Sequence, residues 1–370
     1  MRCRVAVLAF ADATRDGRTL NICRTLAADF DVTLWNLAPA PNEPVAWSWR
    51  RLAVPSRGRM LWRWLRFVVV LLWKCRRERY RLVWAADLYC LLPAVVLRWR
   101  SGARLVYDSR ELYGSLASLA HRPIAQRLQS WYERALVRWA CRVVVSGERD
   151  ADELQRQLRL PDRPLVVLNV PFYAEPRRDD RLRRRCGIGT GEAIVLYQGV
   201  VAEGRGLLRA VEMLASLPQV HLCVLGDGAL TSAVAEYAEQ CSVADRVHLL
   251  GSVPYSELLE WTASADVGWC WIEPVSHSYE LALPNKLFEY AMARVPVVAS
   301  DLPAIAEVLE RFPFGEPVSP TANADELAEA VARVLSAPER YRQWADRAAR
   351  EFCYERQQPV ICRLVEELCQ

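Results

Sequence analysis

Short apolar runs alternate with amphipathic stretches along most of this chain. In the first half these runs are rich in branched side chains, and they are RVAVLAF, VTLW, RLVWAAD, ARLVYDS, RVVVSG and PLVVLNV. Runs of this length predict buried strands, and the amphipathic stretches between them predict helices. Strands that alternate with helices are typical of a parallel sheet in an α/β domain.

The alternation stops in a stretch rich in proline and arginine, PFYAEPRRDDRLRRRCGIGTGEA, and starts again at AIVLYQG. This loss of periodicity predicts a domain boundary near residues 171–192. In the second half we predict helices over Leu207–Leu217, Leu230–Gln240 and Tyr255–Ala265, and the last stretch from Pro338 is strongly helical.

The chain has 370 residues, which is long for one domain and suits two. We therefore predict two doubly wound Rossmann-like domains with a ligand cleft at the carboxyl ends of their strands. The predicted parts are an N-terminal domain over 1–172, a linker over 173–192, a C-terminal domain over 193–350, and a helix over 351–370 that packs across the junction.

Positive charge is concentrated in one part of the chain. Between Arg50 and Arg81 there are ten arginines and one lysine against the single acid Glu78, although the net charge of the whole chain is only +4. Tryptophans are interleaved with these arginines, so residues 47–84 are a candidate surface for an anionic membrane. The alternative is an ordinary domain helix, Leu61–Trp73, with a solvated arginine face.

The cysteines and the apolar runs indicate in which compartment of the cell the protein works. Twelve cysteines are scattered without a CxxC pair or a Cys/His cluster, which favours free thiols over disulfides or zinc. The longest apolar stretch, Phe67–Trp73, has seven residues, far fewer than the roughly 20 of a spanning helix. The N-terminal run suits a first strand better than a signal peptide, so we expect a cytoplasmic protein.

Glycines fall at successive strand ends in the second half, where they permit a positive φ and a close approach of backbone to a ligand. They are Gly199, Gly204, Gly206, Gly226 and Gly251, and Asp227 follows Gly226. This repetition favours a nucleotide-sized ligand over plain turns. The first strand lacks the GxGxxG of a dinucleotide site, and GxxxxGK[ST] is absent, which argues against a dehydrogenase and a P-loop enzyme.

Arg205, Lys286 and Glu289 lie at two predicted helix starts in this half. Two cations suit a diphosphate and a carboxylate suits ribose hydroxyls, so together they favour a nucleotide-diphosphate ligand. The alternative for Lys286 and Glu289 is an exposed i,i+3 pair, which contributes only a few tenths of a kcal/mol.

Several motifs resemble those of family 4 GT-B glycosyltransferases over nearly the whole length. They are ARLVYDSRELYG, VLYQGVVAEGRGLLRAVE, VLGDG, RVHLLGSVPYSELLEWTASADVGWC and, most specifically, LPNKLFEYAMARVPVVASDLP. The resemblance implies the GT-B fold, a nucleotide-sugar donor held by the C-terminal domain, an acceptor held by the N-terminal domain, retention of anomeric configuration, and no metal ion or other cofactor.

The resemblance also implies roles for single residues. Glu289 matches the second glutamate of a paired motif that binds ribose, Arg205 matches the arginine at the diphosphate, and Lys286 lies where a second cation would help. The strand-end glycines, Asp227 and Asn285 are then donor-binding candidates. The first glutamate of the pair is replaced by Leu281, next to Glu280, which weakens the expected contact with the sugar.

In the N-terminal domain the segment DSRE is similar to a family segment that usually carries histidine. Asp108, Arg110 and Glu111 are therefore the acceptor-binding candidates. Arginine does not act as a general base near neutral pH, but it can hold a phosphate or sugar oxygen. Asp150 and Asp152 form a DxD, a metal-binding pattern of another transferase fold, although their stretch also suits an acidic first helical turn.

These observations favour a retaining glycosyltransferase that moves a sugar from a nucleotide-diphosphate sugar to a glycan or a lipid-linked acceptor. We expect it to act in bacterial cell-surface polysaccharide synthesis, at the cytoplasmic face of the membrane and without a nucleic-acid partner. Two alternatives remain, a nucleotide-sugar epimerase of the same fold and a non-catalytic GT-B partner subunit, the latter because of Leu281 and Arg110.

Overall fold

The computed structural model describes residues 2–55, 57–116 and 122–369. It divides into two compact units, residues 1–169 with 354–370, and residues 170–353. The chain therefore enters the second unit three residues before the boundary expected at 172, and its last segment returns to the first unit. Both units are α/β, as the alternation of strands and helices predicted.

The first unit contains one parallel sheet in the strand order β3-β2-β1-β4-β5-β6-β7. Its strands are β1 (Arg4–Leu8), β2 (Asp31–Asn36), β3 (Ser48–Arg51), β4 (Leu82–Ala85), β5 (Arg104–Ser109), β6 (Arg142–Val145) and β7 (Leu165–Val166). Every position of β4 is buried, as expected for a strand that is covered by helices on both faces.

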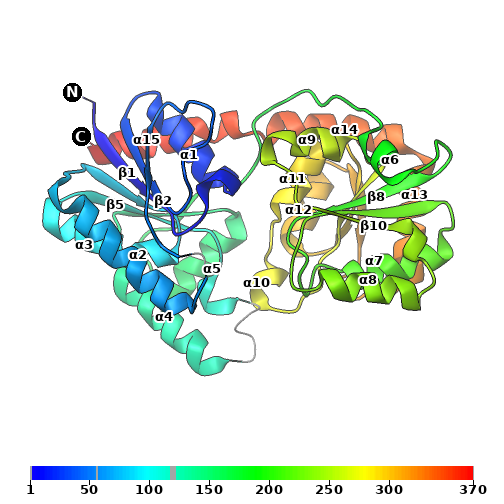
Figure 1. The fold of residues 1–370 in the computed structure, drawn as a ribbon, viewed down its shortest axis with the longest axis horizontal. Coiled ribbons are helices and arrows are strands. Elements are labelled where there is room, and N and C mark those ends of the chain that lie inside the picture. Colours follow the sequence, from blue (N-terminus) through cyan, green and yellow to red (C-terminus); the bar gives the residue numbers. More distant parts are fainter. Residues whose placement is uncertain (1, 56, 117–121, 370) are drawn as a thin grey trace. The chain divides into compact units, whose positions relative to one another are not determined.

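Helices cover both faces of this sheet. They are α1 (Gly17–Ala27), α2 (Met60–Lys74), α3 (Leu88–Ser101), α4 (Pro123–Val137), α5 (Glu148–Leu158) and α15 (Gln358–Cys369). Helices α1 and α15 pack together on one face, whereas α2, α3 and α4 lie on the other (Figure 1). The last segment is held by the Leu168 N–H, which donates to the side-chain oxygen of Gln357 at 3.0 Å.

The second unit is also built on a parallel sheet, with the order β10-β9-β8-β11-β12-β13. Its strands are β8 (Ala193–Gln198), β9 (Val220–Leu225), β10 (Val247–Gly251), β11 (Val267–Cys270), β12 (Val297–Ser300) and β13 (Gly315–Val318). Its helices are α6 (Arg181–Cys186), α7 (Leu207–Glu212), α8 (Thr231–Gln240), α9 (Tyr255–Ala263), α10 (His277–Glu280), α11 (Asn285–Met292), α12 (Pro303–Arg311), α13 (Ala324–Ser336) and α14 (Pro338–Glu351).

Most predicted helices are confirmed within a few residues, but the one over Leu207–Leu217 is shorter. It changes after Glu212 into a 3₁₀ turn over Met213–Ser216. The helical stretch from Pro338 is two helices that belong to different units, α14 to the second and α15 to the first. Among the described residues, no helix combines the length and apolarity needed to cross a bilayer.

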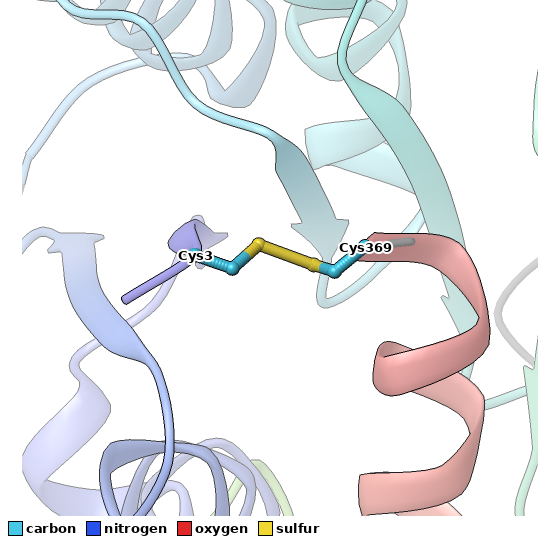
Figure 2. Close-up of a disulfide and its surroundings, with 2 residues drawn as sticks. All are labelled: Cys3 and Cys369. Atoms are coloured by element: carbon cyan, nitrogen blue, oxygen red, sulfur yellow. A yellow bond between two sulfur atoms is a disulfide. The ribbon is translucent and has the colours of Figure 1, made fainter. Parts of the chain in front are cut away.

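The two ends of the chain are joined by a disulfide between Cys3 and Cys369, which corrects the expectation of free thiols (Figure 2). Cys3 precedes β1 and Cys369 ends α15, so the fold brings together residues that are 366 positions apart. Sequence spacing carries no signal for such a pair. The other ten cysteines form no disulfide in the described part of the chain.

Candidate functional site

The sheet of the second unit has its topological switch between β8 and β11. The chain runs from β8 outward to β9 and β10, and then returns to the other side of β8 as β11. The loops that follow β8 and β11 therefore diverge, and this point of a doubly wound sheet is where ligands bind. The predicted donor residues lie on these two connections, on the neighbouring loop that follows β9 and, for Gly251, at the end of β10.

The strand-end glycines allow the loops to pack directly on one another. A Cβ atom on Gly226 would lie 1.9 Å from the carbonyl oxygen of Gly199, and one on Gly228 would lie 2.1 Å from that of Val201. The Gly226 N–H also donates to the Gly251 carbonyl at 2.9 Å. The three predicted glycines of these loops thus lie together, and side chains at Gly226 or Gly228 would push the loops apart.

The loop after β8 carries Arg205 between two glycines of positive φ. Gly206 packs against Trp271, the residue after β11, and Gly204 packs against Tyr279 of α10. The Arg205 guanidinium lies over the Tyr279 ring at 4.6 Å from its centre. No carboxylate of the described chain forms an ion pair with Arg205, so its charge is available to an anionic ligand.

Lys286 occupies the first turn of α11 and is 8% exposed. Its Nζ lies 3.7 Å from the centre of the Tyr197 ring, and no described residue gives it a hydrogen bond or an ion pair. Burial lowers the pKa of its ammonium group to about 7, and the positive charge of Arg205 acts in the same direction. A buried cation with an aromatic ring as its main contact is costly unless an anion binds beside it.

Glu289 lies one turn further along α11, where other polar side chains fix its orientation. The side-chain amide of Gln198 donates to Oε2 of Glu289, and the Thr262 hydroxyl donates to the amide oxygen of Gln198 at 2.8 Å. Burial raises the pKa of the Glu289 carboxyl, while the Gln198 hydrogen bond and the charge of Lys286 oppose this rise. Lys286 and Glu289 are therefore neither a solvated pair nor a direct ion pair.

Asn285 and Asp227 lie at the border of this site. Asn285 is exposed and opens α11. Asp227 accepts hydrogen bonds from the Ser252 N–H at 3.1 Å and from the Ser252 hydroxyl at 3.0 Å. Asp227 thus ties the loop after β9 to the loop after β10.

The residues near the missing glutamate do not replace it. Leu281 ends the short helix α10, and the carboxylate of Glu280 is 3.0 Å from Nδ1 of His277. Glu289, and not Glu280, is the carboxylate whose charge acts on the pKa of Lys286. The site therefore offers two cations and one carboxylate, which suits an anion that carries hydroxyl groups.

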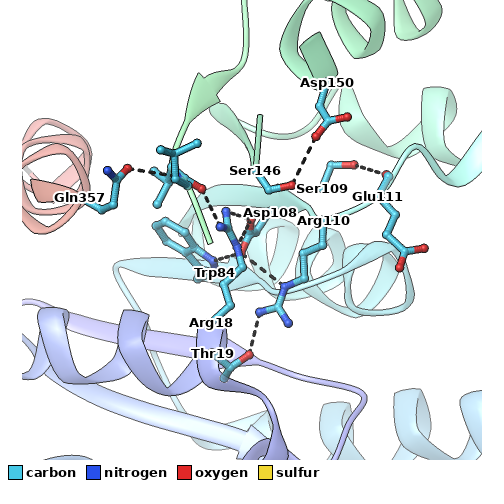
Figure 3. A network of polar contacts seen from close by, with 12 residues as sticks. Arg18, Thr19, Trp84, Asp108, Ser109, Arg110, Glu111, Ser146, Asp150 and Gln357 are labelled. Carbon is cyan, nitrogen blue, oxygen red and sulfur yellow. Dashed lines mark hydrogen bonds and ion pairs between the residues drawn. The ribbon is translucent and has the colours of Figure 1, made fainter. Parts of the chain in front are cut away.

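In the first unit, Asp108 is the centre of a buried charge network (Figure 3). Its carboxylate has no exposed surface and accepts from Nε of Arg18 at 3.0 Å and from Nη2 of Arg18 at 2.7 Å. Arg18 also donates to the Val167 carbonyl at 2.6 Å. These contacts suit a positioning role for Asp108 better than the direct acceptor contact that we predicted.

Arg110 extends the network toward solvent. It donates to Oδ2 of Asp16 at 2.6 Å and to the Thr19 hydroxyl at 2.7 Å, and its Nε is 3.6 Å from Oδ2 of Asp108. Burial opposes its charge, but the carboxylates of Asp16 and Asp108 outweigh burial and raise its pKa. Arg110 is thus a fixed cation at the carboxyl end of β5, beside the exposed Glu111.

The residues of the DxD pattern have separate partners. Oδ2 of Asp150 is 3.4 Å from the Ser146 hydroxyl, and burial raises its pKa to about 6. Asp152 forms an ion pair with Arg163 at 2.7 Å. In the described part of the chain no three His, Cys, Asp or Glu side chains gather in a way that could hold a metal ion.

The sequence patterns did not identify some residues of the two candidate sites. Arg18 and Asp16 lie in the loop and helix after β1, and Gln198, Tyr197 and Thr262 support Lys286 and Glu289. Only Tyr197 and Gln198 could have been found from the sequence, because they lie at the end of a predicted strand just before Gly199. The partners of Arg18 and Glu289 depend on contacts across the fold, which spacing does not show.

Family models match both units. A model described as glycosyl transferase 4-like domain matches residues 17–171, and one described as glycosyl transferases group 1 matches residues 178–351. The fold and these matches define a glycosyltransferase of the GT-B fold. The glycosyl transferase 4-like domain lies in its first unit, and the glycosyl transferases group 1 domain lies in its second unit.

The known proteins that are similar to this chain include the following three. Alpha-D-kanosaminyltransferase of Streptomyces kanamyceticus is 28% identical over 255 residues, which are 66% of this chain and 64% of that enzyme. The structure of sucrose-phosphate synthase from Thermosynechococcus elongatus has a TM-score of 0.79 at 19% identity and covers 99% of both chains. Anabaena Alr3699/HepE, solved with UDP and glucose, has a TM-score of 0.76 at 14% identity and covers 99% of this chain and 100% of its own.

Proposed function

We propose that this glycosyltransferase takes its sugar from a nucleotide-diphosphate sugar that binds at the β8/β11 switch point. The observation that carries the proposal is Lys286, a buried cation without an ion pair among the described residues, whose charge interacts with that of Arg205. A diphosphate between these two cations would compensate both, and Glu289 would accept hydrogen bonds from ribose hydroxyls. The complex of the HepE neighbour with UDP and glucose supports this class of donor.

In the proposed reaction the bond between the sugar C1 and the diphosphate oxygen breaks, the oxygen of an acceptor hydroxyl bonds to C1, and the proton of that hydroxyl passes to the departing diphosphate. Negative charge grows on the departing diphosphate, so Arg205 and Lys286 would stabilise the transition state more than the ground state. Several parts of the proposal come from the sequence alone. They are retention of the anomeric configuration, a glycan or lipid-linked acceptor, a role in bacterial cell-surface polysaccharide synthesis, and a cytoplasmic location.

Calorimetric titration with UDP, GDP and ADP tests the donor site without any knowledge of the acceptor. One of these nucleotides should bind, and the matching monophosphate should bind at least about tenfold more weakly because it spans only one cation. Lys286→Met should weaken binding of the diphosphate, whereas the control Arg347→Met, on α14, should not. No binding by any nucleoside diphosphate would contradict the proposal.

A non-catalytic GT-B subunit remains the second candidate, because Leu281 stands where a carboxylate is expected and Glu280 is engaged by His277. Such a subunit would bind a nucleotide without turnover. Release of nucleoside diphosphate from a nucleotide sugar in the presence of candidate acceptors would exclude it. Conversion of the donor sugar without any acceptor would instead indicate an epimerase.

A further inference from the structure

Helix α2 leaves six of its twelve apolar side chains exposed. Its buried residues are Phe67 and Leu71, whereas Trp62 is 67% exposed and Val69 is 65% exposed. The exposed apolar residues of α2 are Met60, Leu61, Trp62, Leu65, Val69 and Trp73. They recur about every fourth position, so they form a stripe along the outer side of the helix.

Helix α4 carries a second exposed apolar stripe. Ile124, Leu128 and Trp131 follow the i, i+4, i+7 spacing of one helical face, and they are 74%, 61% and 68% exposed. The buried residues of α4 are Glu133 and Val137. Two long helices of the same unit therefore present large apolar side chains to the outside, an arrangement that marks a binding surface.

The two stripes belong to one layer of the first unit. Trp64 of α2 and Tyr132 of α4 are in edge-to-face contact with ring centres 6.3 Å apart, and both helices pack against α3 (Figure 1). Trp64 also donates to the Tyr89 carbonyl of α3 at 2.9 Å. We call the outer side of this layer, formed by the exposed residues of α2 and α4, the α2/α4 face.

Arginines surround the apolar side chains of this face. A groove of about 450 Å³ beside α2 is lined by Pro55, Arg57, Gly58, Trp62, Arg63, Leu65, Arg66 and Val69. On α4, the exposed Arg127 lies one turn from both Ile124 and Trp131. Such alternation of guanidinium groups with tryptophans suits the boundary between lipid headgroups and acyl chains.

Acidic side chains are almost absent from the same layer. There is no Asp or Glu between residues 44 and 77 or between 88 and 101. The one acid of α4, Glu133, is buried and accepts from the Tyr107 hydroxyl at 2.7 Å. The face therefore has positive charge without compensation on its own helices.

We propose that the α2/α4 face docks on an anionic membrane surface, with its tryptophans at the headgroup level and its arginines on lipid phosphates. The positive charge of the face favours a membrane over a second copy of the chain, because two copies joined through the same face would bring arginines against arginines. Anionic lipids supply the opposite sign, and each cation near such a surface strengthens binding. The inference does not rest on the donor site, since it uses residues of the first unit alone.

Sedimentation with vesicles tests this docking. The protein should bind vesicles of phosphatidylcholine with about one third phosphatidylglycerol, should bind pure phosphatidylcholine at least about tenfold more weakly, and should dissociate as salt rises from about 0.1 to 1 M. The double variant Arg66→Glu/Arg127→Glu, which changes one exposed arginine on each helix of the face, should lose at least about tenfold in affinity. The control Arg347→Glu/Arg363→Glu has the same net charge with both changes outside the face, and it should bind as the unchanged protein does.

A second variant pair tests the apolar contribution. Trp62→Gln/Trp131→Gln should weaken vesicle binding at least about tenfold, because each indole loses its place at the interface. The control Leu208→Gln/Tyr255→Gln removes exposed apolar side chains of the second unit and should leave binding unchanged. Equal binding by the face variants and their controls would overturn the proposal, and so would a dimer that the Trp62→Gln/Trp131→Gln variant dissociates.

Discussion

The ammonium nitrogen of Lys286, in the first turn of α11, lies 3.7 Å from the centre of the ring of Tyr197, near the end of β8. A ring face attracts the cation but does not replace its hydration, so burial still lowers the pKa of Lys286 to about 7. This contact joins the end of the first strand of the second unit to the helix with the most specific sequence motif.

The pKa of Lys286 predicts a pH-dependent affinity for nucleoside diphosphate. A bound diphosphate favours the charged ammonium and raises its pKa, so binding above pH 7 takes up a proton. The affinity should therefore fall as pH rises from about 7 to 9, by up to about tenfold per pH unit. Calorimetry at about pH 8 in buffers of different ionisation enthalpy measures the proton uptake directly.

Lys286→Arg is the matched control, because a guanidinium stays charged over this whole range. Its affinity should not change with pH. The protein without ligand gives an independent measurement. The pKa of Lys286 is lower in the folded state than the ordinary value of 10.5, so the unfolded chain binds more protons between the two values. Stability should therefore rise with pH from about 7 to 10.5, and Lys286→Met should lack this contribution.

Arg205 and Arg209 form a natural pair for testing catalysis. Arg205 has the Tyr279 ring as its contact, whereas Arg209 is 45% exposed and forms an ion pair with Glu212 at 2.7 Å. Arg205→Ala should lower kcat by roughly 10²–10³, because a fixed cation at the leaving diphosphate is lost. Arg209→Ala should leave kcat within about a factor of two. Release of nucleoside diphosphate measures both, and equal kcat values would remove Arg205 from the catalytic group.

The sequence indicated those parts of the candidate donor site that are local in the chain. Glycines at strand ends and a cation at a helix start are visible from periodicity, and in the structure Gly199, Gly226 and Gly251 lie together. That these residues bind a donor stays a prediction. What fixes Glu289 was not predictable, because Gln198 lies 91 positions away in the chain and nothing in its spacing indicates the pair.

The first unit shows the same limit more strongly. Asp108 was selected by a motif, but its partner Arg18 is 90 positions away and lies after another strand. A motif gives the identity of a carboxylate and not its burial. Burial decides whether that carboxylate contacts a ligand or holds an arginine. The burial of Asp108 could be known only from the order of the strands, which the structure gives.

The Arg18–Asp108 pair predicts a large effect on stability. Their side chains are 3% and 0% exposed, so Arg18→Met leaves a buried carboxylate with only the more distant Arg110 to compensate it. This should cost about 3–5 kcal/mol of unfolding free energy. Arg18→Met/Asp108→Leu should recover most of it, because no buried charge then lacks its partner.

Hydrogen exchange at the amides of β1 and β5 measures this effect, since it reports on the first unit without the second. Arg163→Met is a useful control, because it breaks ion pairs whose carboxylates on Glu148 and Asp152 are 66% and 68% exposed. Its effect should stay within about 1 kcal/mol. If Arg18→Met were equally mild, the pair would contribute little to the fold.

The disulfide between Cys3 and Cys369 predicts a response to reductant. The bond closes a loop of nearly the whole chain and so restricts the unfolded state, which typically contributes about 2–4 kcal/mol. Dithiothreitol should therefore lower the unfolding temperature of the protein but not that of Cys3→Ser/Cys369→Ser. The same treatment should speed hydrogen exchange in the last turns of α15, which the bond holds beside β1.

The compartment decides whether this bond forms in the cell. A reducing cytosol keeps such cysteines as free thiols, whereas an oxidising compartment joins them in a disulfide. Alkylation of cells at the moment of lysis, followed by peptide mass spectrometry, should show Cys3 and Cys369 alkylated if the protein works in the cytosol, and joined only after purification in air. Peptides joined at the moment of lysis would contradict the cytoplasmic location. Identical unfolding of the protein and its serine variant, with and without reductant, would show that the bond does not form.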